Sequence, residues 1–137
     1  MSDRAQKLIT HILDIIAHKD HDGIDAVLAD EVELNTPRFL KAITDKAHVQ
    51  IVLKTIPKIV EDFHYDRTWP CGDEAIMEFK GNIGPIQVHG LDIFRLNEQG
   101  KVKELTVFIR PTKAHAALAE SEDALIRAEL GKARASA

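Results

Sequence analysis

Asp92 stands in the stretch VHGLDIFRL (residues 88–96), where it is the one carboxylate of a largely apolar, strand-like run. Because the side chains of a strand alternate between its two faces, Asp92 shares a face with Val88 and Phe94. A carboxyl group buried on such a face has a raised pKa and can act as an acid or a hydrogen-bond donor. Two alternatives stay open: a bulge at Gly90 turns the group to solvent, or it accepts structural hydrogen bonds.

Two other places in the chain carry side chains that do chemistry in many proteins. The connector HKDHD places His18, His21 and Asp22 close together, but no fourth ligand follows at a recognisable spacing. We therefore predict a solvated turn there and no metal site. Cys71 is the single cysteine, which excludes an intrachain disulfide. It precedes Gly72 in a predicted turn without a neighbouring histidine or lysine, so the sequence does not support a nucleophilic role.

Hydrophobic periodicity predicts three helices in the N-terminal half. Apolar residues recur there at intervals of three and four, as on the buried side of an amphipathic helix. Ser2 and Asp3 are suited to cap the first helix. Thr44 or Asp45 can cap the third, which Pro57 should end or kink. The expected elements are a helix over residues 2–16, a short helix at Ile24, Val27 and Leu28, a strand over 31–37, and a helix burying Val49, Val52, Leu53 and Ile56.

The second half has the pattern of a sheet followed by one helix. Four strand-like runs are separated by short turns rich in glycine, asparagine and proline, which favours antiparallel neighbours. After Pro111 an alanine-rich segment predicts a C-terminal helix, with Gly131 as its stop and residues 132–137 as a frayed tail. This order indicates one α+β domain over residues 1–131, with helices packed on one face of a curved antiparallel sheet. The predicted strands cover residues 61–70, 74–81, 86–96 and 101–111.

Alternation divides each predicted strand into two faces. One face is apolar apart from Asp92 and is expected to pack toward the helices. Phe63, Tyr65 and Trp69 are expected to share a face, as core or rim residues that can also line a pocket. The outward set is too apolar for contact with water, so we predict a homodimer interface there, the alternative being that the C-terminal helix covers it. This outward set is His89, Leu91, Ile93 and Phe108.

Length, composition and charge exclude several classes of partner. With 137 residues, a formal net charge of −4 and a pI near 5.9, the chain has the composition of a soluble globular domain. Its basic residues are scattered, so we expect no nucleic-acid partner. The N-terminal residues lack the unbroken apolar run of a signal peptide, and no stretch is long and apolar enough to span a bilayer. We therefore expect a cytoplasmic protein that does not contact membranes.

The stretch GLDIFRLNEQGKVKELTVFIRP, with VELNTP in the helical first half, resembles the nuclear transport factor 2-like superfamily, in particular its SnoaL-like branch. The resemblance covers nearly the whole chain. It implies a cystatin-like α+β barrel, in which N-terminal helices close a cone of strongly bent antiparallel sheet around a deep pocket. It also implies that Asp92 points into that pocket and that homodimers form through the outer face of the sheet.

The resemblance to ketosteroid isomerase, a member of this superfamily, is incomplete. In that relative the pocket aspartic acid stays protonated and donates a hydrogen bond to a developing oxyanion, a role that the resemblance implies for Asp92. The isomerase's proton-shuttling aspartate corresponds to Thr36 of this chain, and its tyrosine falls near Ile15. The resemblance therefore speaks against steroid isomerase activity.

Two other relatives are matched only in part. Limonene-epoxide hydrolase uses two aspartates and an arginine, but Asp92 and Arg95 are three residues apart on one strand and lie on opposite faces. Polyketide cyclases of the SnoaL type use an aspartate and a histidine, but His89 faces outward in a regular strand. The remaining candidates for a second polar group in the pocket are His64, Glu33 and Asn35.

Two kinds of function are consistent with these patterns. In the first, an enzyme binds a small, largely apolar molecule and isomerises, cyclises or hydrates it, with Asp92 as acid or hydrogen-bond donor and without a cofactor or metal. In the second, a non-catalytic binding or association module stores or senses a ligand, or its pocket is filled by side chains. The expected pocket residues besides Asp92 are Asn35, Val52, Ile56, His64, Met77, Phe79, Val88, Phe94, Leu105, Val107 and Ile109.

Overall fold

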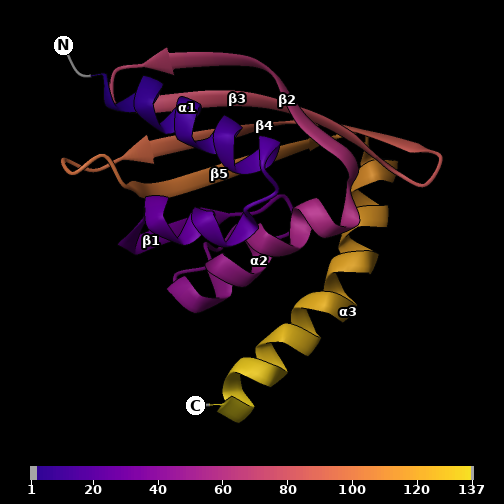
Figure 1. Ribbon diagram of the computed structural model, residues 1–137. Helices are drawn as coiled ribbons and strands as arrows, with labels where there is room; N and C mark the ends of the chain where they lie inside the picture. Colours follow the sequence, from indigo (N-terminus) through magenta and orange to yellow (C-terminus); the bar gives the residue numbers. More distant parts are fainter. Residues whose placement is uncertain (1–2, 137) are drawn as a thin grey trace.

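Helices and strands follow one another in nearly the order predicted from the sequence (Figure 1). The computed structural model describes residues 3–136, and the side chains of residues 3–132. The helices pack against one five-stranded sheet. The elements are α1 (Arg4–Ala17), η1 (His21–Val27), β1 (Leu28–Asn35), α2 (Lys46–Ile59), β2 (Glu61–Cys71), β3 (Glu74–Ile83), β4 (Ile86–Leu96), β5 (Val102–Arg110) and α3 (Thr112–Ser136).

The sheet has the strand order β1-β5-β4-β3-β2. Strands β2 to β5 are each antiparallel to the next, as the short turns between them predict. β1 joins the sheet at its edge, parallel to β5. Because β1 and β2 form two separate edges, the curved sheet is not closed into a barrel. The predicted α+β fold is confirmed in this open form.

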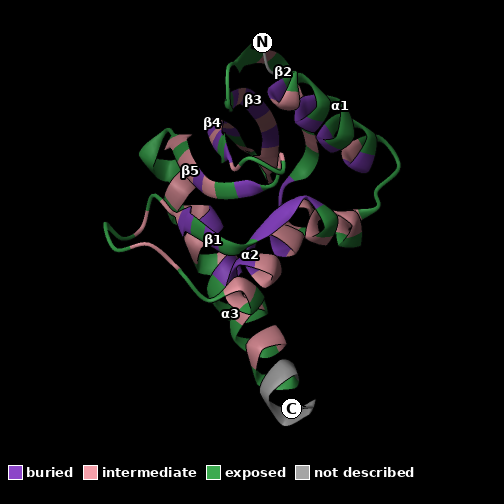
Figure 2. Ribbon diagram, turned by 90° about the vertical axis from the view of Figure 1, so that its left-hand side faces the viewer, coloured by how far each residue is buried: buried purple, intermediate pink, exposed green. Residues whose placement is uncertain are grey.

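The main core lies between α1, α2 and the inner face of the sheet. Along α1 the predicted stripe is buried from Ala5 to Ile15, while Leu13 is exposed. Figure 2 shows buried residues concentrated where the helices and the sheet face each other. Asp3 occupies the N-cap position of α1 without a side-chain capping bond, and Ser2 lies outside the described residues.

Two predicted helices differ from the structure in detail. The short second helix is the 3₁₀ helix η1, and Leu28 already belongs to β1. α2 is capped by Asp45, whose carboxylate accepts a hydrogen bond from the N–H of Ala47 at 3.1 Å. Pro57 lies inside the last turn of α2 and neither ends the helix there nor prevents it from reaching Ile59. Proline lacks the N–H that would bond to the carbonyl of residue 53, and only Lys58 and Ile59 follow it in the helix, so little of the helix depends on the turn that it weakens.

The C-terminal helix packs on the inner side of the sheet and on α2. Ala114 joins Phe79 and Val88 in a second, smaller core cluster, and Leu118 is buried. Ile126, further along α3, packs against the main core. α3 therefore lies on the inner side of the sheet rather than over the apolar outer face, contrary to the alternative considered from the sequence.

The end of α3 lies beyond the predicted stop. The helix passes through Gly131 and reaches Ser136, so the prediction that this glycine ends it is wrong. A glycine in an exposed helix costs about 1 kcal/mol, which lowers helix stability without forcing a stop. The fraying of residues 132–137 stays a prediction, and Ala137 lies outside the described residues.

A register shift in β2 changes which of its aromatic residues face inward. The shift lies between Tyr65 and Thr68 relative to β3. The extra residue inverts the alternation beyond it, so Trp69 opposes Ile76 on the outer face. The prediction that Trp69 shares a face with Phe63 and Tyr65 is wrong for this reason.

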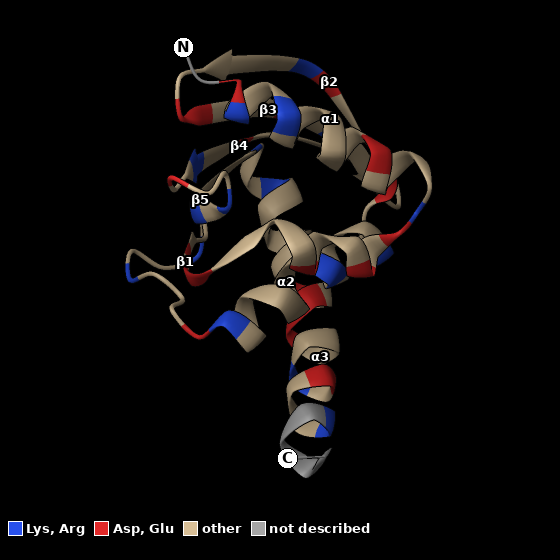
Figure 3. Cartoon of the chain, turned by 60° about the vertical axis from the view of Figure 1, so that its left-hand side comes forward, with Lys and Arg blue, Asp and Glu red and all other residues tan. Residues whose placement is uncertain are grey.

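Figure 3 shows that positions of Lys and Arg are interspersed along the chain with positions of Asp and Glu. Within residues 3–136, none of the helices combines the length and the hydropathy needed to cross a bilayer.

Candidate functional site

Asp92 points to the inner face of the sheet, as the alternation predicts. β4 pairs with both β3 and β5 without a register shift over residues His89–Arg95. Asp92 opposes Met77 on one side and Val107 on the other. Because no bulge occurs at Gly90, the carboxylate does not turn to solvent, and Asp92 is only 7% exposed.

Tyr65 is the hydrogen-bond partner of Asp92. Its hydroxyl donates to Oδ2 of Asp92 at 2.7 Å. Burial raises the pKa of Asp92 to about 7. The hydrogen bond from Tyr65 favours the carboxylate and so lowers this pKa, but its effect is smaller than that of burial. Burial, followed by the neighbouring carboxylate, raises the pKa of Tyr65 well above its ordinary value. Sequence reasoning treats Tyr65 only as a lining residue, although its alternation with Phe63 already places it on the inner face.

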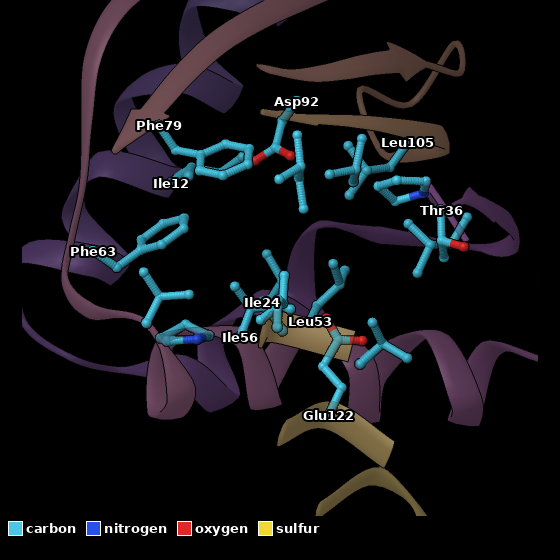
Figure 4. A pocket seen from close by; sticks show the side chains of 18 of the residues that line it. Ile12, Ile24, Thr36, Leu53, Ile56, Phe63, Phe79, Asp92, Leu105 and Glu122 are labelled. Atoms are coloured by element: carbon cyan, nitrogen blue, oxygen red, sulfur yellow. The ribbon is translucent and has the colours of Figure 1, made fainter. Parts of the chain in front are cut away.

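Asp92 lies in the wall of a cavity of about 100 Å³ between the sheet and the helices (Figure 4). This volume is several times the ~10–15 Å³ that holds one water molecule, so the cavity has room for a small organic ligand. Its lining is largely apolar. The predicted pocket residues that line the cavity together with Asp92 are Val52, Ile56, Phe79, Phe94, Leu105, Val107 and Ile109.

Four predicted pocket residues lie elsewhere. Met77 is fully buried in the main core, and Val88 packs in the smaller cluster beside α3. The side-chain amide of Asn35 donates to Oγ1 of Thr106 at 3.0 Å, across the β1–β5 pair. His64 is exposed, because neighbouring residues of a strand face opposite sides and Tyr65 takes the inner one.

Gly90 makes room for the aromatic part of the cavity wall. A Cβ atom at this position would lie 2.4 Å from Cζ of Phe79 and 2.2 Å from the carbonyl oxygen of Phe108. The ring of Phe79 stacks on Phe63 with 5.5 Å between centroids, and Phe63 meets Tyr65 edge-on at 5.3 Å. The absence of a side chain at Gly90 thus supports the ring packing that positions the Tyr65 hydroxyl.

Polar side chains from other elements also line the cavity. Thr36 and Arg38 come from the loop after β1, His21 comes from η1, and His115 and Glu122 come from α3. Glu122 is 9% exposed, and burial raises its pKa to about 7. Nδ1 of His21 and Nε2 of His115 are buried without a hydrogen-bond partner. Sequence reasoning misses both α3 residues, although their separation of seven places them on one face of a helix.

A family model for the SnoaL-like domain matches residues 9–105 of this sequence. The chain belongs to the SnoaL-like domain family. An uncharacterised protein with a cystatin-like fold from Silicibacter pomeroyi is similar in structure, with 29% identity and a TM-score of 0.78. The similarity covers 85% of this chain and 82% of that one. A search of curated proteins found no match.

Two further structures show that the SnoaL-like fold extends over nearly the whole chain. A steroid delta-isomerase from Pseudomonas aeruginosa is 23% identical with a TM-score of 0.86, covering 96% of this chain and 97% of that one. An LEH-like epoxide hydrolase from M. tuberculosis is 18% identical with a TM-score of 0.62, covering 91% and 96%. At these identities the two comparisons establish the fold and nothing about the chemistry.

The SnoaL-like cavity has a threonine at the position before Pro37. Thr36 lines the cavity, and its Oγ1 accepts a hydrogen bond from the backbone N–H of Arg38 at 3.2 Å. Within the described part of the chain, Tyr65 is the side chain that hydrogen-bonds to Asp92. No carboxylate or imidazole from residues 3–132 is therefore bonded to Asp92 as a proton relay.

The outer face of the SnoaL-like sheet carries the residues predicted to form a dimer interface. Phe108 is 55% exposed, and His89, Leu91 and Ile93 are half-buried. α3 packs on the opposite side of the sheet. The apolar residues Leu91, Ile93 and Phe108 lie on this face beside charged ones, and no helix covers it among the described residues.

Glu78, on the same outer face, is a second buried carboxyl group. It is 2% exposed and accepts two hydrogen bonds from the guanidinium of Arg67, at 2.9 and 2.8 Å. Nε2 of His89 lies 2.8 Å from one of its oxygens. These hydrogen bonds hold the pKa of Glu78 well below its ordinary value. Glu78 is therefore an ionised, structural carboxylate.

The region predicted to be a solvated turn contains no metal-binding arrangement. Within the described residues, no three histidine, cysteine, aspartate or glutamate side chains are grouped to hold a metal ion. Instead, His18 contacts Asp14, while Asp22 and Asp25 pair with Lys54.

Proposed function

We propose that this SnoaL-like protein binds a small, largely apolar carbonyl compound in its cavity and activates it through a hydrogen bond donated by Asp92. Isomerisation, cyclisation and hydration are the reaction classes that such activation promotes. The observation that carries the proposal is the buried Asp92–Tyr65 pair in an otherwise mostly apolar wall. Carbonyl oxygen is the ligand atom that best complements a lone neutral carboxyl group.

The proton of Asp92 has a defined place in this arrangement. Oδ2 already accepts the hydrogen bond from Tyr65, so in the neutral acid Oδ1 is the oxygen free to carry the proton toward a ligand. With a pKa of about 7, a large share of the molecules hold this proton at neutral pH. In a cavity of low polarity, water competes little for the donated hydrogen bond, which strengthens it as negative charge develops on the carbonyl oxygen.

The fold neighbours support an enzyme without identifying its reaction. They include a steroid delta-isomerase and an LEH-like epoxide hydrolase, so this fold accommodates chemistry on small molecules. We do not propose steroid isomerisation for this chain, because Thr36 stands where the resemblance places the proton-shuttling aspartate. A threonine hydroxyl is too weak a base for that step at neutral pH.

The proposal is tested by comparing ketones with hydrocarbons of the same shape. We expect cyclohexanone to bind about tenfold more tightly than methylenecyclohexane, and Asp92→Leu to remove this preference. Asp66→Asn, which changes an exposed aspartate on β2, should leave the preference intact. Ketone binding should also weaken above about pH 7, where Asp92 loses its proton. Equal binding of ketone and hydrocarbon by the wild-type protein would overturn the proposal.

A non-catalytic binding module of the same fold is the second candidate. It is favoured by the missing base: the polar group next to Asp92 is the Tyr65 hydroxyl, which itself resists deprotonation. The two candidates differ in whether a bound ligand is changed. Incubation with a panel of enones, epoxides and lactones should yield isomers or hydrates for the enzyme, and unchanged compounds for the binding module.

We also propose that two copies of the chain associate through the outer face of the sheet. Phe108 is its most exposed large apolar residue, and Leu91 and Ile93 flank it. Phe108→Glu should convert a dimer to a monomer in analytical ultracentrifugation. Phe39→Glu is the matched control, because Phe39 is similarly exposed, at 58%, but lies in the loop after β1. A wild-type monomer, or equal effects of both variants, would contradict the proposed interface.

A further inference from the structure

The inner face of α3 brings a second carboxyl group to the cavity. His115, Leu118, Ala119 and Glu122 line the cavity from this helix, at the spacing of one helical face. The match to the SnoaL-like domain ends at residue 105, before α3 begins. The family match therefore assigns no role to these residues.

Glu122 is a largely buried carboxyl group that faces the cavity beside one cation. It is 9% exposed, and its cationic neighbour among the described residues is Arg38, whose charge lowers the pKa of Glu122 against the larger effect of burial. The nearby guanidinium of Arg38 is bonded to Asp123 instead, the exposed neighbour of Glu122 on α3. Nε2 of His115, on the same face, is also buried and unpartnered. Since buried polar groups in native proteins almost always have partners, an occupant of the cavity is expected to supply one to His115, and Glu122 on the same helix face is open to the same occupant.

Asp92 and Glu122 enter the cavity from opposite sides. Figure 4 shows Asp92 projecting from the sheet and Glu122 from the opposite wall, with side chains of Ile24 and Leu53 beside the space between them. Two carboxyl groups that shuttle a proton between neighbouring substrate atoms must both lie within hydrogen-bond reach of those atoms. Placement on opposite walls is better suited to holding the two ends of one molecule.

We propose that Glu122 forms a second polar subsite, which binds a hydroxyl group at the far end of a ligand whose carbonyl lies at Asp92. The ligand is then a hydroxy ketone with an apolar middle. This inference rests on the proposed function, because it takes the carbonyl at Asp92 as the first anchor.

A hydroxyl group fits this subsite better than an ammonium group. A hydroxyl donates to the carboxylate form of Glu122 and accepts from its neutral form, so it complements both. Burial makes both forms accessible near neutral pH, since the pKa of Glu122 is about 7. An ammonium group would need the carboxylate form and would meet the positive charge of Arg38, which also lines the cavity.

The test uses methyl ketones of seven to nine carbons, each with and without a hydroxyl group on its last carbon, in isothermal titration calorimetry. For the chain length that spans the cavity, the hydroxyl should increase affinity about tenfold in the wild-type protein. Glu122→Leu should erase this gain, and Glu122→Gln should keep part of it. Glu120→Leu is the matched control on the same helix, because Glu120 is exposed, and it should retain the full gain.

The possible results separate this inference from the proposed function. If the plain ketones bind and depend on Asp92 but the hydroxyl adds nothing at any length, the Glu122 subsite is refuted and the carbonyl site stands. A hydroxyl gain that survives Glu122→Leu refutes the subsite as well. If no ketone binds, both proposals fail. Amide NMR spectra of each variant show whether the fold is intact, and Glu122→Gln, which retains the side-chain shape, serves where Glu122→Leu does not fold.

Discussion

Two buried carboxyl groups lie on neighbouring strands and on opposite faces of the same sheet. Asp92 on β4 faces the cavity and is 7% exposed, while Glu78 on β3 faces outward and is 2% exposed. Their pKa values move in opposite directions: that of Asp92 rises to about 7, and that of Glu78 falls well below its ordinary value. Two side chains with similarly low exposure therefore have pKa values shifted in opposite directions.

The partners of the two groups explain the difference. Glu78 accepts two hydrogen bonds from the cationic guanidinium of Arg67 and contacts His89, so its negative charge is stabilised. Asp92 has one neutral partner, the hydroxyl of Tyr65, which cannot offset the loss of hydration. A carboxyl group left without a cation in this way destabilises the fold when it ionises, a cost that proteins usually accept at functional sites.

The largest expected effect concerns the stability of Asp92→Asn. In the folded chain Asp92 keeps its proton up to about pH 7, whereas in the unfolded chain the carboxyl group loses its proton near pH 3.8. The free energy of unfolding therefore falls as the pH rises between these two values. A pKa difference of this size corresponds to about 4 kcal/mol. Asp92→Asn removes this cost and should be more stable than the wild type by about that amount at pH 8. Urea unfolding measures the difference.

The pH dependence controls for effects of the amide itself. Near pH 3 the wild-type carboxyl is neutral in the folded state and largely neutral in the unfolded state, so the two proteins should have nearly equal free energies of unfolding there. A variant with the same advantage at both pH values would indicate better packing instead. A variant no more stable at pH 8 would contradict the raised pKa of Asp92.

The same chemical change on the other face should have a smaller effect of opposite sign. The lowered pKa of Glu78 stabilises the fold above about pH 4.5, its ordinary value, and this contribution is lost as the pH falls below it. Glu78→Gln should therefore lower the midpoint of thermal unfolding by several degrees at pH 7, and progressively less in acid. Glu74→Gln, on the same strand but half-exposed beside Arg95, should change it little. Equal effects of the two variants would show that Glu78 is not specially stabilised.

The inner position of Asp92 could be predicted because β4 is paired regularly on both sides. From His89 to Arg95 neither neighbouring strand inserts an extra residue, so the alternation in the sequence holds in the structure. The partner of Asp92 could not be predicted in the same way. Tyr65 lies on β2, next to the register shift that turns Trp69 outward, and the sequence carries no clear signal of that shift.

The α3 residues that line the cavity could not be predicted from the sequence, for a different reason. The sequence shows that residues 112–131 favour a helix, but which face of that helix reaches the cavity depends on how it docks against α2 and the sheet. Ala114, Leu118 and Ile126 mark the buried face of the helix at intervals of four, and Glu122 is the charged residue in that series, next to the polar residues Ser121 and Asp123. Docking of this kind is a tertiary property that periodicity alone does not specify.

The smallest expected effect isolates the hydrogen bond that distinguishes Asp92 from a fully unpartnered acid. Because the Tyr65 hydroxyl favours the carboxylate, Tyr65→Phe should raise the pKa of Asp92 further above 7, by about one pH unit. Carbon-detected NMR of the carboxyl group measures this value, with Asp92→Asn assigning the signal. Thr36→Val, which removes another cavity hydroxyl that is not bonded to Asp92, should leave it unchanged. An unchanged titration in Tyr65→Phe would mean that burial alone sets the acidity of Asp92, and that Tyr65 does not direct its proton toward the cavity.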